Sequence, residues 1–298
     1  MESTIIVIDD VSPDGCAERA AKLLERHTNA ETITLSQFLK SSGFSYDHRI
    51  GMLVRDPVAA AEFTARASET RLLNRVVEIS NDTCNALLDP ERPHGPDTLP
   101  ARFVFAAYVS LFGAFKHVLG RPGRYSPVGH LLPLDLQWYE VGKRRRDVGV
   151  PRYAYSQFVA GPIDFERPIW TTAYDLYNWK VNATPELASL HPFVVERPEG
   201  QPVMVYFIGG ESAAFSMDDE RRLQDDERAR LLALVPTLKE AFGADMGEGL
   251  FFIDGEKIVF AAFSHHLLTS MQRKKFEGVL ERGLLGWLGE GAREVAYS

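Results

Sequence analysis

The N-terminal segment alternates between apolar runs and a helix with one apolar face, a pattern typical of a parallel α/β unit. Residues 4–8 form a β-branched run between polar residues, which predicts a buried strand. Asp14 is placed to cap a following helix whose apolar face includes Ala20 and Leu24. Residues 32–35 predict a second strand. A strand, a helix and a strand of these lengths indicate a right-handed βαβ unit with a parallel sheet.

The middle of the chain is divided by two segments rich in proline and glycine, residues 89–100 and 121–127, which are typical of loops. Apolar residues at helical spacing predict a helix between them, over residues 103–119. We place a domain boundary at the second loop. The predicted N-terminal α/β domain therefore spans residues 1–125, and a second domain spans residues 126–298.

Two β-hairpins are the clearest feature of the second domain. Gly209-Gly210 and Asp254-Gly255 each separate two apolar strands, and such dipeptides are typical of tight hairpin turns. A charged amphipathic helix or helix pair is predicted between the hairpins, over residues 221–242. The tail over residues 269–289 is expected to be helical, and its apolar stripe fits either the core or the interface of a homodimer.

Composition matters mainly for what it excludes. The net charge of −8 argues against nonspecific binding to nucleic acid or to an anionic membrane. No apolar run approaches the about 18 residues that a membrane span needs. Two cysteines are too few for a disulfide framework, which favours the cytoplasm. The basic run at residues 143–146 is expected to be a solvated helix end, with a surface for an anionic ligand or partner as the alternative.

The order of these elements resembles the ATP-grasp superfamily, in its glutathione-synthetase-like and ribosomal-protein-glutamyl-ligase-like branch. A helix predicted over residues 134–146 leads through Gly149-Val150-Pro151 into a lid lobe of about residues 152–195. A hinge at residues 193–197 then precedes the two hairpins. The resemblance implies an α/β protein with an N-terminal parallel-sheet domain and an ATP-grasp-like α+β domain. Its lid is expected to be reduced, because residues 157–166 are few for the helix that the family places there.

The resemblance also implies a chemistry. ATP-grasp ligases use ATP to activate a carboxylate as an acyl phosphate, which an amine then attacks, and cations with two magnesium ions hold the phosphates. Arg167 matches the place of a phosphate-contacting lysine, with the charge but not the geometry of an ammonium. Lys180 is the second candidate for the phosphates. Glu196 would meet the ribose, and the backbone near Val194 the adenine.

The magnesium positions are where the chain departs most from the family pattern. The Glu and the Asn of the closing strand fall on Ala262 and Ser264. The acid expected before the last hairpin falls near Leu250. Candidate metal ligands within a few residues of that place are Asp245, Glu248 and Asp254.

Three functions stay open from the sequence. The favoured one is a divergent ATP-grasp-like pseudoenzyme with lost or altered magnesium-ATP chemistry, which requires no cofactor and presents a peptide or amino acid to a partner enzyme. The second is an active carboxylate–amine ligase with ATP and magnesium as cofactors. The third is an unrelated enzyme in the same cleft, which would use His265 and His266 as acid, base or metal ligands.

Overall fold

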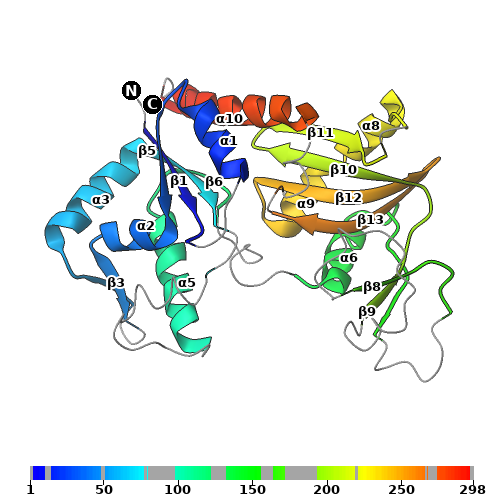
Figure 1. The fold of residues 1–298 in the computed structure, drawn as a ribbon, viewed down its shortest axis with the longest axis horizontal. Helices are drawn as coiled ribbons and strands as arrows, with labels where there is room; N and C mark the ends of the chain where they lie inside the picture. Colours follow the sequence, from blue (N-terminus) through cyan, green and yellow to red (C-terminus); the bar gives the residue numbers. More distant parts are fainter. Residues whose placement is uncertain are drawn as a thin grey trace. The chain divides into compact units, whose positions relative to one another are not determined.

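The chain folds into two units, which the ribbon in Figure 1 shows coloured along the sequence. The first unit comprises Met1–His130, Ile208–Glu211 and His265–Ser298, and the second comprises Leu131–Phe207 and Ser212–Ser264. The domain limits predicted from the sequence, 1–125 and 126–298, stay a prediction. The computed structural model describes residues 3–10, 15–47, 51–76, 79, 98–121, 132–155, 164–171, 193–218, 221–265, 267 and 274–295.

A four-stranded parallel sheet forms the centre of the first unit. Its order is β2-β1-β5-β6, and every neighbouring pair is parallel. The strands are β1 Ser3–Ile8, β2 Asn29–Thr34, β5 Thr70–Arg75 and β6 His117–Leu119. The predicted parallel sheet is therefore confirmed. The second strand ends before Leu35, because Leu35 begins the next helix.

Helices cover both faces of this sheet: α1 Gly15–Leu24, α2 Leu35–Ser41, α3 Pro57–Glu69, α5 Thr98–Phe112 and α10 Lys274–Val295. Helices α1 and α10 lie on one face, and α2, α3 and α5 lie on the other (Figure 1). An antiparallel hairpin of β3 Phe44–Asp47 and β4 Gly51–Val54 precedes α3. The predicted helix over residues 103–119 ends earlier, at Phe112, because residues 117–119 extend to pair with β5. Asp14 lies outside the described residues.

Phe38 of α2 lies at the centre of the apolar core under one face of the sheet. Its ring is 5.6 Å from that of Phe63 and 5.0 Å from that of Phe112, both at edge-to-face angles. Ile5 and Val7 of β1 belong to the same core. Ile6 lies between them in the sequence and therefore points to the opposite face. The core thus joins β1 to three helices through α2.

The start of α2 is fixed by polar groups from two strands. The Thr34 hydroxyl accepts a hydrogen bond from the main-chain nitrogen of Gln37 at 3.3 Å, and the Gln37 side chain accepts one from the Thr34 nitrogen at 2.9 Å. This reciprocal pair is a capping box. Asp10, which follows β1, accepts hydrogen bonds from the main-chain nitrogen and the hydroxyl of Ser36. The carboxylate of Asp10 therefore stabilises the first turn of α2.

Two hairpins form the larger sheet of the second unit. The sheet order is β11-β10-β12-β13, and its strands are β10 Gln201–Ile208, β11 Glu211–Ser216, β12 Met246–Asp254 and β13 Lys257–Ser264. Gly209 and Gly255 have φ angles of +55° and +57°, a backbone conformation that favours glycine in tight turns. Both hairpins predicted from the sequence are therefore confirmed.

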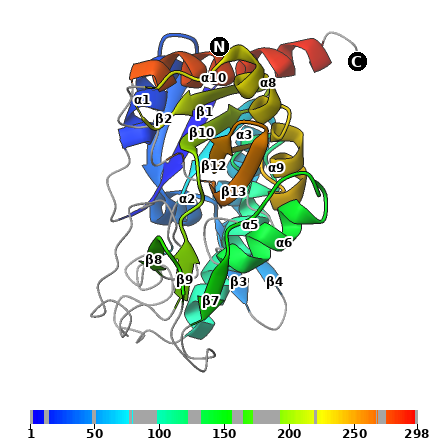
Figure 2. The ribbon, with the colours of Figure 1, turned by 90° about the vertical axis from the view of Figure 1, so that its right-hand side faces the viewer.

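Three helices lie in the described part of the second unit: α6 Leu134–Gly142, α8 Asp225–Leu232 and α9 Val235–Phe242. Figure 2 shows α6 and α9 beside β13. Phe242 of α9 stacks on Phe263 of β13 with ring centroids 4.2 Å apart, and the Trp138 indole donates to the carbonyl of Ala261 at 2.8 Å. The segment over residues 221–242 is a helix pair, and the helix predicted over 134–146 stops at Gly142. No described helix of the chain is long and apolar enough to cross a membrane.

A small antiparallel sheet carries the hinge. Its order is β7-β9-β8, with β7 Tyr153–Tyr155, β8 Pro168–Thr171 and β9 Phe193–Glu196. The strand expected around Arg167 begins one residue later, at Pro168. Residues 156–163 and 172–192 lie outside the described residues, and the expected length of the lid depends on them.

The basic run after α6 is held in ion pairs at the surface. Lys143 and Arg144 both reach Glu140, at 2.7 and 2.6 Å, and the Arg145 guanidinium lies 2.6 Å from the carboxylate of Asp147. Hydrogen bonds from Lys143 and Arg144 lower the pKa of Glu140. These pairs agree with the expectation of a solvated helix end.

Replacing Arg145 by glutamine is expected to raise the pKa of Asp147. The hydrogen bond from Arg145 lowers the pKa of Asp147 from 3.8 to about 2. The stabilising contact is therefore complete above pH 3.8 and is lost as the pH falls through about 2. A carboxyl-detected NMR titration measures the midpoint in both proteins. An unchanged midpoint in Arg145→Gln would contradict the assigned cause, with Arg146→Gln as the control.

Candidate functional site

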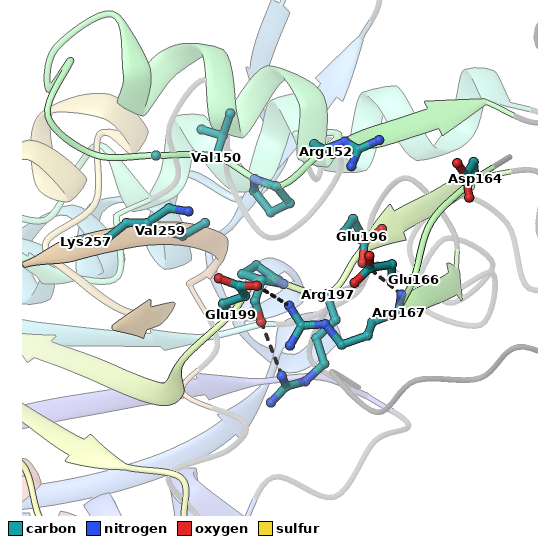
Figure 3. Close-up of a pocket in the computed structure, with 13 residues that line it drawn as sticks. Val150, Arg152, Asp164, Glu166, Arg167, Glu196, Arg197, Glu199, Lys257 and Val259 are labelled. Carbon is teal, nitrogen blue, oxygen red and sulfur yellow. Dashed lines mark hydrogen bonds and ion pairs between the residues drawn. The ribbon is translucent and has the colours of Figure 1, made fainter. Parts of the chain in front are cut away.

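Four segments of the second unit enclose a cavity of about 460 Å³ (Figure 3). They are residues 149–152, residues 164 and 166–167, the hinge at residues 196–199, and the start of β13 at Lys257 and Val259. A volume of this size is within the range of small-ligand pockets, about 300–1,000 Å³. The cavity is therefore the candidate functional site.

Main-chain hydrogen bonds position the walls of the cavity. Gly149 donates to the carbonyl of Ile258 at 2.8 Å and accepts from the nitrogen of Phe260 at 2.9 Å, so Gly149-Val150-Pro151 runs beside β13. On the opposite side, the nitrogen of Arg197 donates to the carbonyl of Arg167 at 2.8 Å. The hinge is thereby held next to the start of β8.

Gly200 allows the hinge to approach β12 closely. Its φ angle is +91°, in the region that favours glycine. A Cβ atom at this position would lie 2.2 Å from the carbonyl oxygen of Ile253. No side chain fits in such a space, so the wall formed by residues 196–199 depends on glycine at this position.

The structure brings together two residues that the sequence predicts for a nucleotide, Arg167 and Glu196. The main-chain nitrogen of Arg167 donates to Oε1 of Glu196 at 2.8 Å. The Arg167 guanidinium instead reaches the carboxylate of Glu199 at 3.7 Å, as Figure 3 shows. The positions are thus neighbours at the cavity, and the carboxylate of Glu196 fixes the backbone ahead of β8.

Arg197 lines the cavity, and the sequence predicted no role for it. Its guanidinium lies over the ring of Phe252 on β12, 5.2 Å from the centroid, and donates to the carbonyl of Pro198 at 3.2 Å. Burial, followed by the nearby charge of Arg167, lowers the pKa of Arg197. An arginine directly after a strand and before Pro-Glu-Gly was the available signal, but its ring contact depends on tertiary structure.

The β12–β13 hairpin carries the positions that the resemblance gives to magnesium. Glu248 pairs in register with Ser264, and Leu250 pairs with Ala262. Cross-strand partners share a face of the sheet. The residue between Glu248 and Leu250 is Gly249, where a Cβ atom would contact Leu238 of α9. The pairs Glu248–Ser264 and Leu250–Ala262 therefore face away from α9, on the side where Phe252 meets Arg197.

These residues do not fit a two-magnesium site. Mg²⁺ takes oxygen ligands in octahedral geometry, and Leu250 and Ala262 have no side-chain oxygen. Glu248 is fully buried on this face, and the other β12 acid of the same face, Asp254, lies exposed beside the turn. Among the residues that the structure describes, no three His, Cys, Asp or Glu side chains gather where they could hold a metal ion.

Two of the predicted metal ligands, Glu248 and Asp254, are also far apart along one strand. Glu248 lies opposite the end of β13, and Asp254 lies beside the turn, in register with Lys257. The six residues between them correspond to about 20 Å at the rise of a β-strand. Asp254 and Glu248 therefore cannot share one ion. Asp245 precedes β12 and stays a separate candidate.

The other predicted site residues are not part of the cavity as described. Val194 is in the central strand of the small sheet, in register with Ala154 and Trp170, so its backbone groups point along the sheet. His265 follows β13 directly and is half-buried. Lys180 and His266 lie outside the described residues. A catalytic use of His265 and His266 stays a prediction.

Solved structures of ATP-grasp ligases are similar to this chain over nearly its whole length. The ligase PsnB complexed with precursor peptide PsnA2 and AMPPNP has a TM-score of 0.59 at 13% identity, covering 96% of this chain and 97% of that one. A RimK-domain ATP-grasp protein from Sphaerobacter thermophilus has a TM-score of 0.52 at 14% identity, covering 94% and 97%. D-alanine–D-alanine ligase from Bacillus anthracis has a TM-score of 0.54 at 11% identity, covering 99% and 98%.

Sequence comparison adds no relative to these structures. No protein-family model matches the chain, and no curated protein matches it. At such low identities the structural likeness shows the fold alone. The expected fold, a parallel-sheet domain joined to an ATP-grasp-like α+β domain, is confirmed by these neighbours.

Proposed function

We propose that this chain, which has the ATP-grasp fold, is a ligase-like peptide-binding protein in which magnesium-dependent ATP chemistry has been lost or altered. The proposal rests on the side chains of one face of the β12–β13 hairpin. Ala262 occupies a position where the resemblance expects a carboxylate, Leu250 lies near the other such position, and both side chains are buried. Apolar side chains cannot coordinate magnesium.

The loss of these carboxylates affects phosphoryl transfer, the step that depends most on neutralising negative charge. Transfer of a phosphoryl group requires its developing negative charge to be neutralised, and such electrostatic stabilisation is usually the largest catalytic contribution. Of the β12 acids on this face, Glu248 lies beside Leu250 and Ala262 and Asp254 lies far away at the turn, so one carboxylate is supplied where two ions would need several. The fold can therefore keep a binding surface without keeping the reaction.

The charge of the cavity supports a peptide or amino acid as the ligand. Its walls carry both signs of charge, with arginines and acids side by side at the hinge (Figure 3). A peptide offers charged groups and amides that match such a mixed surface. The similar ligase PsnB has been solved with a precursor peptide. In this proposal the chain holds a peptide for a partner enzyme that carries out the reaction.

Calorimetric titration with ATP, with and without magnesium, tests the proposal. We expect magnesium to leave the affinity for ATP within about threefold, because Glu248 is the one β12 carboxylate beside Leu250 and Ala262. An affinity for ATP that rises tenfold or more on adding magnesium, about 1.4 kcal/mol, would contradict the proposal. Formation of ADP with a candidate peptide would contradict it as well.

An active carboxylate–amine ligase is the second candidate function. The position of Glu248 favours it, since this carboxylate lies opposite Ser264, where the resemblance expects the Asn. If the chain is a ligase, Glu248→Gln should reduce magnesium-dependent ATP turnover by about a hundredfold or more. Asp254→Asn, at the exposed turn, should leave the turnover unchanged. Thermal unfolding of both variants shows whether the fold is kept.

A further inference from the structure

We propose that the hinge cavity binds a peptide through a carboxylate, which the Arg197 guanidinium holds with help from Arg167. The inference rests on the proposed peptide-binding function and names the group that is recognised. Both arginines line the cavity and come from neighbouring segments, Arg167 ahead of β8 and Arg197 after β9 (Figure 3).

Arg197 is prepared to bind an anion. A guanidinium has five N–H donors. In the described part of the chain, Arg197 donates to the carbonyl of Pro198 and makes no ion pair with an acid. Its packing against Phe252 holds the planar group in place, so little side-chain freedom is lost when a ligand binds. The donors that remain are available to an anion.

The neighbouring charge of Arg167 makes an anion favourable at this point. Burial and, after it, repulsion by the charge of Arg167 lower the pKa of Arg197. Glu199 offsets part of the charge of Arg167 at 3.7 Å, but both side chains of that pair are substantially exposed. An exposed pair of this kind is weak. An incoming carboxylate would reduce the repulsion and form charge-assisted hydrogen bonds with Arg197.

The cavity as a whole matches one negative charge better than several. Counted over the described residues, its lining has equal numbers of acidic and basic side chains, which are Asp164, Glu166, Glu196 and Glu199 against Arg152, Arg167, Arg197 and Lys257. A triphosphate would meet acids that repel it, with no excess of cations to compensate. A single carboxylate needs only the local pair of arginines. The apolar side chains of Val150 and Val259 offer surface to the rest of a peptide.

Calorimetry with three synthetic peptides tests the inference. The probes are acetyl-Ala-Ala-Ala with a free C-terminal carboxylate, the same peptide as its amide, and acetyl-Ala-Glu-Ala amide, whose carboxylate is on a side chain. We expect the neutral amide to bind at least about tenfold more weakly than a carboxylate peptide, because a charge-assisted hydrogen bond is lost. The two charged peptides distinguish a C-terminal from a side-chain carboxylate. Equal affinity for all three peptides would overturn the inference.

Variants assign the effect to Arg197. Arg197→Gln is expected to weaken binding of the carboxylate peptide by about tenfold or more. Arg197→Lys is expected to weaken it by less, because lysine keeps the charge but loses the planar set of N–H donors. Arg228→Gln is the control, since Arg228 is an exposed arginine of α8 that pairs with Asp225 and does not line the cavity. If Arg197→Gln is poorly folded, Arg197→Lys and the three peptides still test whether Arg197 binds the carboxylate.

The outcomes separate this inference from the proposed function. Peptide binding that Arg197→Gln leaves unchanged would overturn the carboxylate site while the peptide-binding function stands. Magnesium-dependent ATP affinity without affinity for any of the three peptides would overturn both. Loss of peptide binding in Arg197→Gln and its retention in Arg228→Gln would support both.

Discussion

Replacing Phe38 by alanine is expected to destabilise the first unit by about 3–5 kcal/mol, the range for removing a buried phenylalanine. The Phe38 side chain is 1% exposed and contacts rings from α3 and α5, so the space it leaves cannot be filled by water or by movement of one neighbour. The lost contacts and the cavity both contribute. Urea unfolding, followed by tyrosine and tryptophan fluorescence and by circular dichroism, measures the change.

Val58→Ala is the control for this experiment. Val58 lies on α3 and is 68% exposed, so its truncation is expected to change the free energy of unfolding by less than about 0.5 kcal/mol. A loss below about 1 kcal/mol in Phe38→Ala would mean that the ring is not central to the core. The packing described for α2 would then be wrong.

Replacing Gly200 by alanine is expected to destabilise the second unit by about 2–5 kcal/mol. Two effects combine: a positive φ costs a non-glycine residue about 1–2 kcal/mol, and a Cβ atom 2.2 Å from the Ile253 carbonyl forces the backbone to shift, which typically costs about 1–3 kcal/mol. The shift would also move Glu199, so weaker peptide binding should accompany the loss of stability. Denaturant unfolding and peptide titration measure the two effects.

Gly255→Ala separates the two effects. Gly255 also has a positive φ, of +57°, but a Cβ atom there would meet nothing within 4 Å. It therefore reports the backbone cost alone. Equal losses in Gly200→Ala and Gly255→Ala would show that the approach of the hinge to β12 is not as close as described.

The sequence predicted the elements whose conformation depends mainly on neighbouring residues. The β-branched run at residues 4–8 became β1, and Gly209-Gly210 and Asp254-Gly255 became hairpin turns with a positive φ at Gly209 and Gly255. By contrast, β6 was predicted as the end of a helix. A three-residue strand shows no periodicity, and its conformation is set by pairing with β5, which the sequence around it does not reveal.

The candidate site was predictable only in part for the same reason. The resemblance indicated Arg167 and Glu196, and the cavity contains both. The orientation of Arg197 depends on the ring of Phe252, more than fifty residues later in the sequence. It also depends on the close approach of the hinge to β12, which Gly200 permits. The separation of Glu248 from Asp254 could have been foreseen, because a turn at Asp254-Gly255 places Glu248 about 20 Å away along the strand.

The membership of α10 in the first unit has a consequence for biosynthesis. Arg71 of β5 donates to the carbonyls of Trp287 and Leu288, and the Arg19 guanidinium lies near Glu277. These partners leave the ribosome more than two hundred residues apart, so the earliest part of the chain must wait for the latest to complete its packing. The second unit has all of its strands and helices before residue 265 and can mature first. Nascent chains halted ahead of α10 should therefore expose to chaperones the part of the parallel sheet and of α1 that α10 covers.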